Sequence, residues 1–251
     1  MNEGLARARG AVFNFINSDD ILLPGTLEVV GATLGPGPMQ AGREVIGLAG
    51  AVIDRGPDGD RMFMPRGLSL EELLEHDHFH QPGIWLKTAV LRDLGGFDPD
   101  YSYCFDKALY LRLGARGEPV ALTDRPLAVF RVHPASKTSQ AHDRFRAETI
   151  RALRAVLPEA PVAHRRSISR QIARLQRQED KAALLARAEA LLSGERIAPG
   201  ARRAVLALAL RQPRAALNLR LLEAFLLGTD RRRERQRRRN SRRQDRHGSR
   251  G

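Results

Sequence analysis

The chain has 251 residues, of which 42% are apolar and 5% are aromatic, and this size allows one globular domain with appendages or at most two domains. Its single cysteine, Cys104, excludes a disulfide framework and the zinc and iron–sulfur sites that need several cysteines. No apolar run approaches the roughly 20 residues that cross a bilayer, and the first residues lack the apolar core of a signal peptide. We therefore expect a soluble cytoplasmic protein.

The net charge of +13 is concentrated at the C-terminal end of the sequence. Residues 231–251 contain eleven arginines, and their acidic residues are Glu234 and Asp245. Since this stretch has almost no apolar residues with which to form a core, we expect residues 230–251 to be a disordered tail. The tail also lacks aromatic rings for base stacking, so we expect no specific nucleic-acid partner. A basic nucleic-acid-binding protein is a less favoured alternative that rests on the tail alone.

Up to about residue 140, short apolar runs alternate with turns and short helical patterns, which predicts an α/β layer structure. Ser69 and Glu72 form the pattern of a capping box, and glycines after residues 94 and 116 are typical helix ends. In chain order, the pattern predicts a strand over 11–16, a helix over 24–34, strands over 44–54 and 61–64, helices over 69–76, 88–94 and 105–115, and a strand over 127–132.

From Arg144 onward the pattern is helical, because apolar residues recur at spacings of three, four or seven. We therefore divide the chain into an α/β domain (1–140), a helical C-terminal region (141–229) and the tail (230–251). Arginines and leucines are interleaved over residues 202–227, a pattern that can lie on an anionic membrane surface. The alternative is a helix that packs on the rest of the protein and exposes its basic face.

Two polar motifs are candidates for metal binding. Asp19 and Asp20 follow the first predicted strand, and carboxylate oxygens are the ligands that Mg²⁺ or Mn²⁺ prefers. The alternative is that the Asn-Ser-Asp-Asp turn only caps the next helix. His76, His78 and His80 would point the same way on an extended segment and could bind Zn²⁺ or Ni²⁺, but a loop that faces solvent or the acceptor cleft is the favoured interpretation of these histidines.

Four stretches form an ordered set of longer motifs. Residues 2–25 read N-x-G-x-x-x-A-x-G, then a strand, then N-S-D-D and L-P-G, and residues 81–98 contain Q-P, a helix and G-G-F-D. Residues 105–113 read F-D-x-x-L-Y-L-R-L, and residues 130–138 read F-R-V-H-x-x-S-K-T. Together these motifs resemble the family-2 inverting glycosyltransferases, whose catalytic domain has the GT-A fold.

The resemblance implies an incomplete GT-A sheet, which is a Rossmann-like nucleotide-diphospho-sugar transferase sheet, followed by the helical region and the tail. In that family further strands and the nucleotide-base pocket precede the N-x-G segment, so we expect an incomplete donor pocket in a chain that begins at Met1. The implied activity is sugar transfer, with inversion, from a nucleotide-diphospho-sugar donor to a hydroxyl of a saccharide or lipid-linked acceptor. We expect this activity to serve cell-surface polysaccharide or glycoconjugate biosynthesis at the inner face of the membrane. The alternative is a truncated, inactive remnant that acts as a binding module.

The resemblance also assigns roles to individual residues. Asp106 would be the general base, and its place at a helix N-terminus predicts that the helix dipole keeps it ionised. Where the family has a second acidic residue in this helix, this sequence has Ala108. The expected ligands of Mg²⁺ or Mn²⁺ are Asp19, Asp20 and His133, and the expected substrate-binding residues are Asn17, Ser18, Gln81, Trp85 and Arg131. A packing role for Trp85, a structural His133, and an Arg131 that only pairs with a carboxylate are the alternatives.

Overall fold

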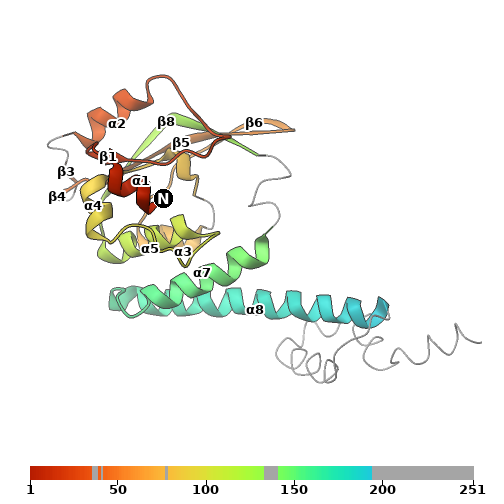
Figure 1. Cartoon of the computed structure of the whole chain (residues 1–251). Helices are drawn as coiled ribbons and strands as arrows, with labels where there is room; N and C mark the ends of the chain where they lie inside the picture. The colour runs from red at the N-terminus through yellow and green to blue at the C-terminus, as the bar shows by residue number, and fades with distance from the viewer. Residues whose placement is uncertain (36–38, 41, 77–78, 133–140, 194–251) are drawn as a thin grey trace, which may run out of the picture. The chain divides into compact units, whose positions relative to one another are not determined.

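The structure, a computed structural model, describes residues 1–35, 39–40, 42–76, 79–132 and 141–193 (Figure 1). The chain forms two compact units, Met1–Ala173 and Arg174–Gly251, and the sheet and the candidate site belong to the first unit. The predicted metal ligand His133, the arginine- and leucine-rich segment 202–227 and the predicted disordered tail lie outside the described residues.

The centre of the first unit is a mixed six-stranded sheet with the order β1-β7-β5-β8-β2, in which β6 also pairs with β5. β5 and β8 are parallel, and the other pairs in this sheet are antiparallel. One edge of β5 is shared, because β7 pairs with its first half and β6 with its second half. The strands are β1 (Val12–Phe13), β2 (Ile21–Leu22), β5 (Gly47–Gly56), β6 (Gly59–Phe63), β7 (Ile84–Lys87) and β8 (Val120–Arg131); β3 (Met39–Gln40) and β4 (Arg43–Glu44) form a separate hairpin.

Helices cover both faces of the sheet in the first unit, with α2 on one side and α3 and α5 on the other (Figure 1). This arrangement explains why residues 47–52 of β5 are all buried, since a strand covered on both faces is apolar on both. The helices are α1 (Asn2–Arg7), α2 (Thr26–Leu34), α3 (Leu70–Glu75), α4 (Thr88–Asp93), α5 (Phe105–Arg116), α7 (His142–Val156) and α8 (Val162–Ser193).

A hydrophobic core lies between α2 and the sheet. Leu48 and Leu127 are fully buried there, and they pack with Val30 and Leu34 of α2. Thr26, at the start of α2, donates its hydroxyl hydrogen to the carbonyl oxygen of Leu127 (2.6 Å). The buried hydrogen bond fixes the start of the helix to β8 without leaving a polar group unpaired.

The predicted mixture of helices and strands is confirmed, and most predicted elements are present with shifted ends. The capping box is one example, because the Glu72 N–H donates to the Ser69 hydroxyl oxygen (3.3 Å). Gly117 ends α5 with φ +64°, a conformation that favours glycine. The strand predicted over 11–16 is shorter, with β1 limited to Val12–Phe13, whereas β8 begins at Val120, seven residues before the predicted strand. The prediction missed α1, β2, β3 and β7.

None of the helices in the described part of the chain combines the length and the apolar character needed to cross a membrane.

Candidate functional site

The Asn17–Asp20 turn lies between β1 and β2. The Asp20 N–H donates to the Asn17 carbonyl oxygen (3.1 Å), and the Asn17 side-chain amide donates to Asp20 Oδ2 (3.0 Å). The residue before the first turn of α2 is Gly25, and no side chain caps this helix. The alternative in which this turn caps α2 is therefore wrong.

Gln81 connects this turn to the start of β7. Its side-chain oxygen accepts a second hydrogen bond from the Asn17 amide (3.2 Å), and the residue is 7% exposed. The buried Nε2 of Gln81 has no hydrogen-bond partner among the described residues. Nearby, the Asn14 side chain donates to the carbonyl oxygen of Pro82 (3.0 Å), which ties the two segments together a second time.

Arg131, at the end of β8, meets the same turn through its backbone. Its N–H donates to Asp20 Oδ1 (3.4 Å) because the pairing of Ile21 with Val129 brings the start of β2 beside the end of β8. The structure thus brings together Asn17, Asp20, Gln81 and the Arg131 backbone, while the Arg131 side chain and Ser18 are exposed.

The electrostatics of the turn are compatible with a bound cation. Burial raises the pKa of Asp20 above its usual range, and the neighbouring charge of Asp19 adds to this effect. A divalent ion would reverse the repulsion between the two carboxylates, and Mg²⁺ is often held by one or two carboxylates together with substrate phosphates. Within the described ranges no group of three or more His, Cys, Asp and Glu residues is arranged to hold a metal. Asp19 and Asp20 are the carboxylates of this turn that could serve as ligands of such an ion.

Asp106 lies in the first turn of α5, and its Oδ1 accepts a hydrogen bond from the Lys107 N–H (2.7 Å). Withdrawal of the carboxyl group from solvent raises its pKa to about 6, although backbone hydrogen bonds act in the opposite direction. The group is still ionised at pH 7, as expected, but desolvation has a larger effect on its pKa than the interactions that favour the charged form. A carboxylate with a pKa near 6 is suited to accept a proton close to neutral pH.

Aromatic contacts connect the Asp106 region to the Asn17–Asp20 turn and to Gln81. The ring of Phe105 lies 5.4 Å from that of Phe15, two residues before the turn. The ring of Tyr110, one turn along α5 from Asp106, lies 6.4 Å from that of Phe79, two residues before Gln81. Both contacts place the start of α5 beside the segments that carry the other predicted site residues.

Trp85 occupies a different environment. It belongs to the hydrophobic core under α2, together with Leu48 and Leu127, and is 7% exposed. Packing, the alternative weighed for this residue, accounts for its position. Its indole N–H is buried and has no partner among the described residues.

Of the three alternating histidines, the two that the structure describes, His76 and His80, contact different residues. His76 contacts Arg66 (2.6 Å between Nε2 and Nη1) and Glu72 (3.6 Å), whereas His80 lies 3.4 Å from Asp54 Oδ1. The rings of Phe63 and Phe130 pack against His80 at 4.1 and 5.1 Å. His78 lies outside the described residues.

Asp54 was not predicted as a site residue, and His80 was considered only as part of the less favoured Zn²⁺ motif, although both lie next to the site in the chain or in the sheet. His80 precedes Gln81, and Asp54 pairs with Phe130 beside Arg131. The sequence carries a signal for Asp54, which directly follows the apolar run Ala51-Val52-Ile53.

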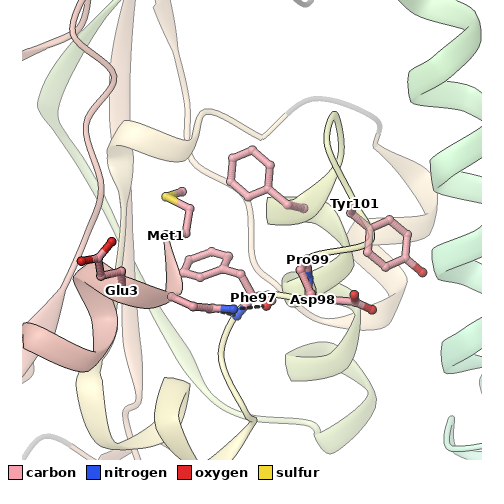
Figure 2. A pocket seen from close by; sticks show the side chains of 8 residues that line it. Met1, Glu3, Phe97, Asp98, Pro99 and Tyr101 are labelled. Atoms are coloured by element: carbon pink, nitrogen blue, oxygen red, sulfur yellow. Dashed lines mark hydrogen bonds between the residues drawn. The ribbon is translucent and has the colours of Figure 1, made fainter.

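A shallow pocket of about 370 Å³ lies beside the N-terminal end of α5 (Figure 2). Its wall includes three aromatic residues, Phe97, Tyr101 and Phe105, together with Asp98. At one side the Asn2 amide donates to the Phe97 carbonyl oxygen (2.7 Å) and its oxygen accepts from the Phe97 N–H (2.9 Å), a pair of bonds that joins α1 to the G-G-F-D motif.

The sequence matches no protein-family model and no curated protein, so the geometry and the motifs alone bear on function.

Proposed function

We propose that the chain is a metal-dependent, inverting glycosyltransferase of the family-2 type, with a Rossmann-like GT-A sheet. The observation that carries the proposal is the hydrogen-bonded network of Asn17, Asp20 and Gln81, which is anchored on the Arg131 backbone. All four residues belong to the motifs of the resemblance, and the bonded pair Asp20 and Arg131 is separated by 111 residues in the chain.

A second observation supports the proposal. The N-x-G and G-G-F-D motifs contact each other through the paired bonds between Asn2 and Phe97. A side chain at Gly96 would place its Cβ 2.7 Å from Asn2 Oδ1, so this contact also requires the small residue of the motif. Motifs that are far apart in the chain therefore form one connected region.

The proposed reaction is a single displacement. Asp106 accepts the proton of an acceptor hydroxyl, and the hydroxyl oxygen forms a bond to the anomeric carbon of the donor sugar. The bond from that carbon to the diphosphate oxygen breaks, and the nucleoside diphosphate leaves with the electron pair. Because one displacement inverts the anomeric centre, no covalent carboxylate nucleophile is needed, in contrast to retaining glycosidases.

Asp19 and Asp20 would hold Mg²⁺ or Mn²⁺, which supplies positive charge to a leaving diphosphate. The unpaired Gln81 Nε2 would donate to a donor oxygen, because a buried donor without a partner is costly until a ligand satisfies it. Arg131, with its exposed side chain, would attract the anionic donor. The acceptor is a saccharide or a lipid-linked saccharide, and the reaction takes place at the cytoplasmic side of a membrane.

The experiment is calorimetric titration of the purified chain with a panel of nucleoside diphosphates, with and without Mn²⁺, followed by sugar-transfer assays with the cognate donor. Asp20→Asn should weaken Mn²⁺-dependent binding by about tenfold or more, which corresponds to about 1.4 kcal/mol. Asp106→Asn should preserve binding and reduce transfer by about 10²–10⁴-fold. Asp124→Asn, at an exposed aspartate of β8, is the matched control and should change neither.

Two results would overturn the proposal. The first is a folded chain that binds no nucleoside diphosphate with Mn²⁺. The second is transfer that Asp106→Asn leaves unchanged. Mn²⁺-dependent binding without any transfer would instead favour the binding-module alternative.

A further inference from the structure

The loop before α5 is held by one face of α7. Arg144, Glu148 and Arg151 are spaced four and three residues apart, so they lie on the same side of the helix. Each of them contacts the loop at residues 100–104, which leads directly into the turn of α5 that carries Asp106.

Glu148 makes the central contact. Its carboxylate accepts hydrogen bonds from three consecutive backbone N–H groups, those of Ser102 (3.1 Å), Tyr103 (2.8 Å) and Cys104 (2.9 Å). Burial acts to raise the pKa of Glu148, but these three donors prevail and hold its pKa below the usual range. Hydrogen bonds from backbone N–H groups to a carboxylate are among the stronger ones in proteins.

The two arginines contact the aromatic residues of the same loop. The Arg144 guanidinium donates to the Tyr103 hydroxyl oxygen (2.7 Å) and lies 5.6 Å from the centre of its ring. The Arg151 guanidinium lies 4.4 Å from the centre of the Tyr101 ring and donates to the Asp100 carbonyl oxygen. The ring of Phe145 packs against that of Tyr103 at 5.5 Å.

The start of α5 depends on this external support. The residue that precedes its first turn is Cys104, whose side chain makes no capping hydrogen bond. A helix start without a side-chain cap is typically less stable by about 1 kcal/mol. Glu148, which is 44 residues further along the chain, satisfies the Cys104 N–H and the two N–H groups before it.

We propose that Glu148 is a positioning residue for Asp106. Through Glu148, α7 keeps the carboxyl group of the general base shielded from water, as the reaction requires. The proposal rests on the proposed function for the role of Asp106 as the general base, but the positioning itself is a property of the fold. Asp106 interacts electrostatically with Lys107, Tyr110 and Cys104, and it is separated from Glu148 by the loop backbone that Glu148 binds. Loss of the Glu148 contacts frees this backbone and lets water reach the Asp106 carboxyl group.

The test is the pKa of the Asp106 carboxyl group, measured by ¹³C NMR titration of the purified chain and assigned with Asp106→Asn. The wild-type value should be near 6. In Glu148→Ala it should fall by about one unit or more toward the ordinary aspartate value of about 3.9. Asp143→Ala removes an exposed acid from the same helix and is the matched control, for which the value should not change.

A purely structural role for Glu148 would lower the stability of the folded state but leave the Asp106 pKa of the folded molecules unchanged. A folded Glu148→Ala variant with an unchanged pKa would therefore overturn the proposal. If this variant does not fold, Glu148→Gln replaces it, because its amide oxygen keeps one acceptor. An unchanged Asp106 pKa in Glu148→Gln would then overturn the proposal, and a fall of about half a unit or more would support it.

The NMR measurement needs no turnover, so the two proposals fail separately. A shifted pKa in a protein that transfers no sugar would uphold the positioning role and reject the proposed function. Sugar transfer with an unshifted pKa would uphold the function and reject the positioning role. In an active enzyme, the acidic limb of the kcat/KM profile should move to lower pH together with the NMR value.

Discussion

α5 passes so close to the start of α3 that position 114 has no room for a side chain. A Cβ atom on Gly114 would lie 2.7 Å from the carbonyl oxygen of Leu68 and 3.1 Å from the backbone nitrogen of Leu70. Both are backbone atoms in a buried segment, so they cannot move aside as the end of a flexible side chain can. Gly31, in the middle of α2, provides the matched comparison, because nothing lies within 4 Å of a Cβ added there.

Two opposing effects decide the outcome of a glycine-to-alanine substitution at these positions. Alanine stabilises a helix interior by about 0.5–1 kcal/mol relative to glycine. An added group in a closely packed region destabilises the folded state by about 1–3 kcal/mol. Gly31→Ala has the first effect alone and should stabilise the protein by about 0.5–1 kcal/mol. Gly114→Ala has both, and the backbone contact should make it destabilising by about 1–2 kcal/mol.

Thermal unfolding followed by circular dichroism measures both variants. For a chain of this size about 1 kcal/mol corresponds to a change of about 2–4 °C in Tm. Gly31→Ala should therefore raise the Tm by about 1–4 °C, and Gly114→Ala should lower it by about 2–8 °C. Equal increases in the two variants would refute the close approach of α3 and α5, since only that contact gives the substitutions opposite signs.

Two further predictions concern the core and the pH dependence of stability. Leu48 is fully buried, so Leu48→Ala should reduce the free energy of unfolding, measured in urea, by about 2–5 kcal/mol. Leu122→Ala, at a side chain that is 54% exposed, should change it little. Equal effects of the two substitutions would contradict the core assignment. The pKa of Asp106 is about 6 in the folded protein and about 3.9 in the unfolded chain, so the folded state loses stability as pH rises from about 4 to 6. Asp106→Asn does not lose stability in this way, so its Tm should be higher than that of the wild type at pH 7.5 but similar at pH 4. A lower Tm of this variant at pH 7.5 would contradict the burial of the carboxyl group.

Local sequence signals predicted the elements that local interactions define. Ser69 and Glu72 lie three residues apart, and the hydrogen bond between them forms as the capping pattern predicts. Gly117 likewise ends α5 through its own backbone conformation. The missed strand β2 is different, because its two residues are extended only through pairing with β8, more than 100 residues along the chain. A two-residue strand has no periodicity of its own to detect.

The same distinction applies to the candidate site. The Asn17–Asp20 turn could be predicted because its hydrogen bonds join neighbours in the sequence. The link to Gln81 spans 64 residues and was reached through the motif resemblance, which places the two segments in one region. Glu148 belongs to none of the motifs, and in the sequence it is one of two acids on an amphipathic helix. Its role depends on the packing of α7 against α5, which neither spacing nor composition reveals.

Asp106 shows why position within a helix does not determine the charge state of a residue. The dipole at a helix N-terminus stabilises a carboxylate by about 0.3–1 kcal/mol, which is less than one pKa unit. Desolvation can raise a carboxyl pKa by several units, and at Asp106 it exceeds the opposing effects of the dipole and the backbone N–H groups. The result is a group that is ionised at pH 7 yet binds a proton about a hundredfold more tightly than an exposed aspartate does. Burial therefore gives α5 a stronger base than the helix terminus alone would provide, and this burial depends on the loop that Glu148 holds in place.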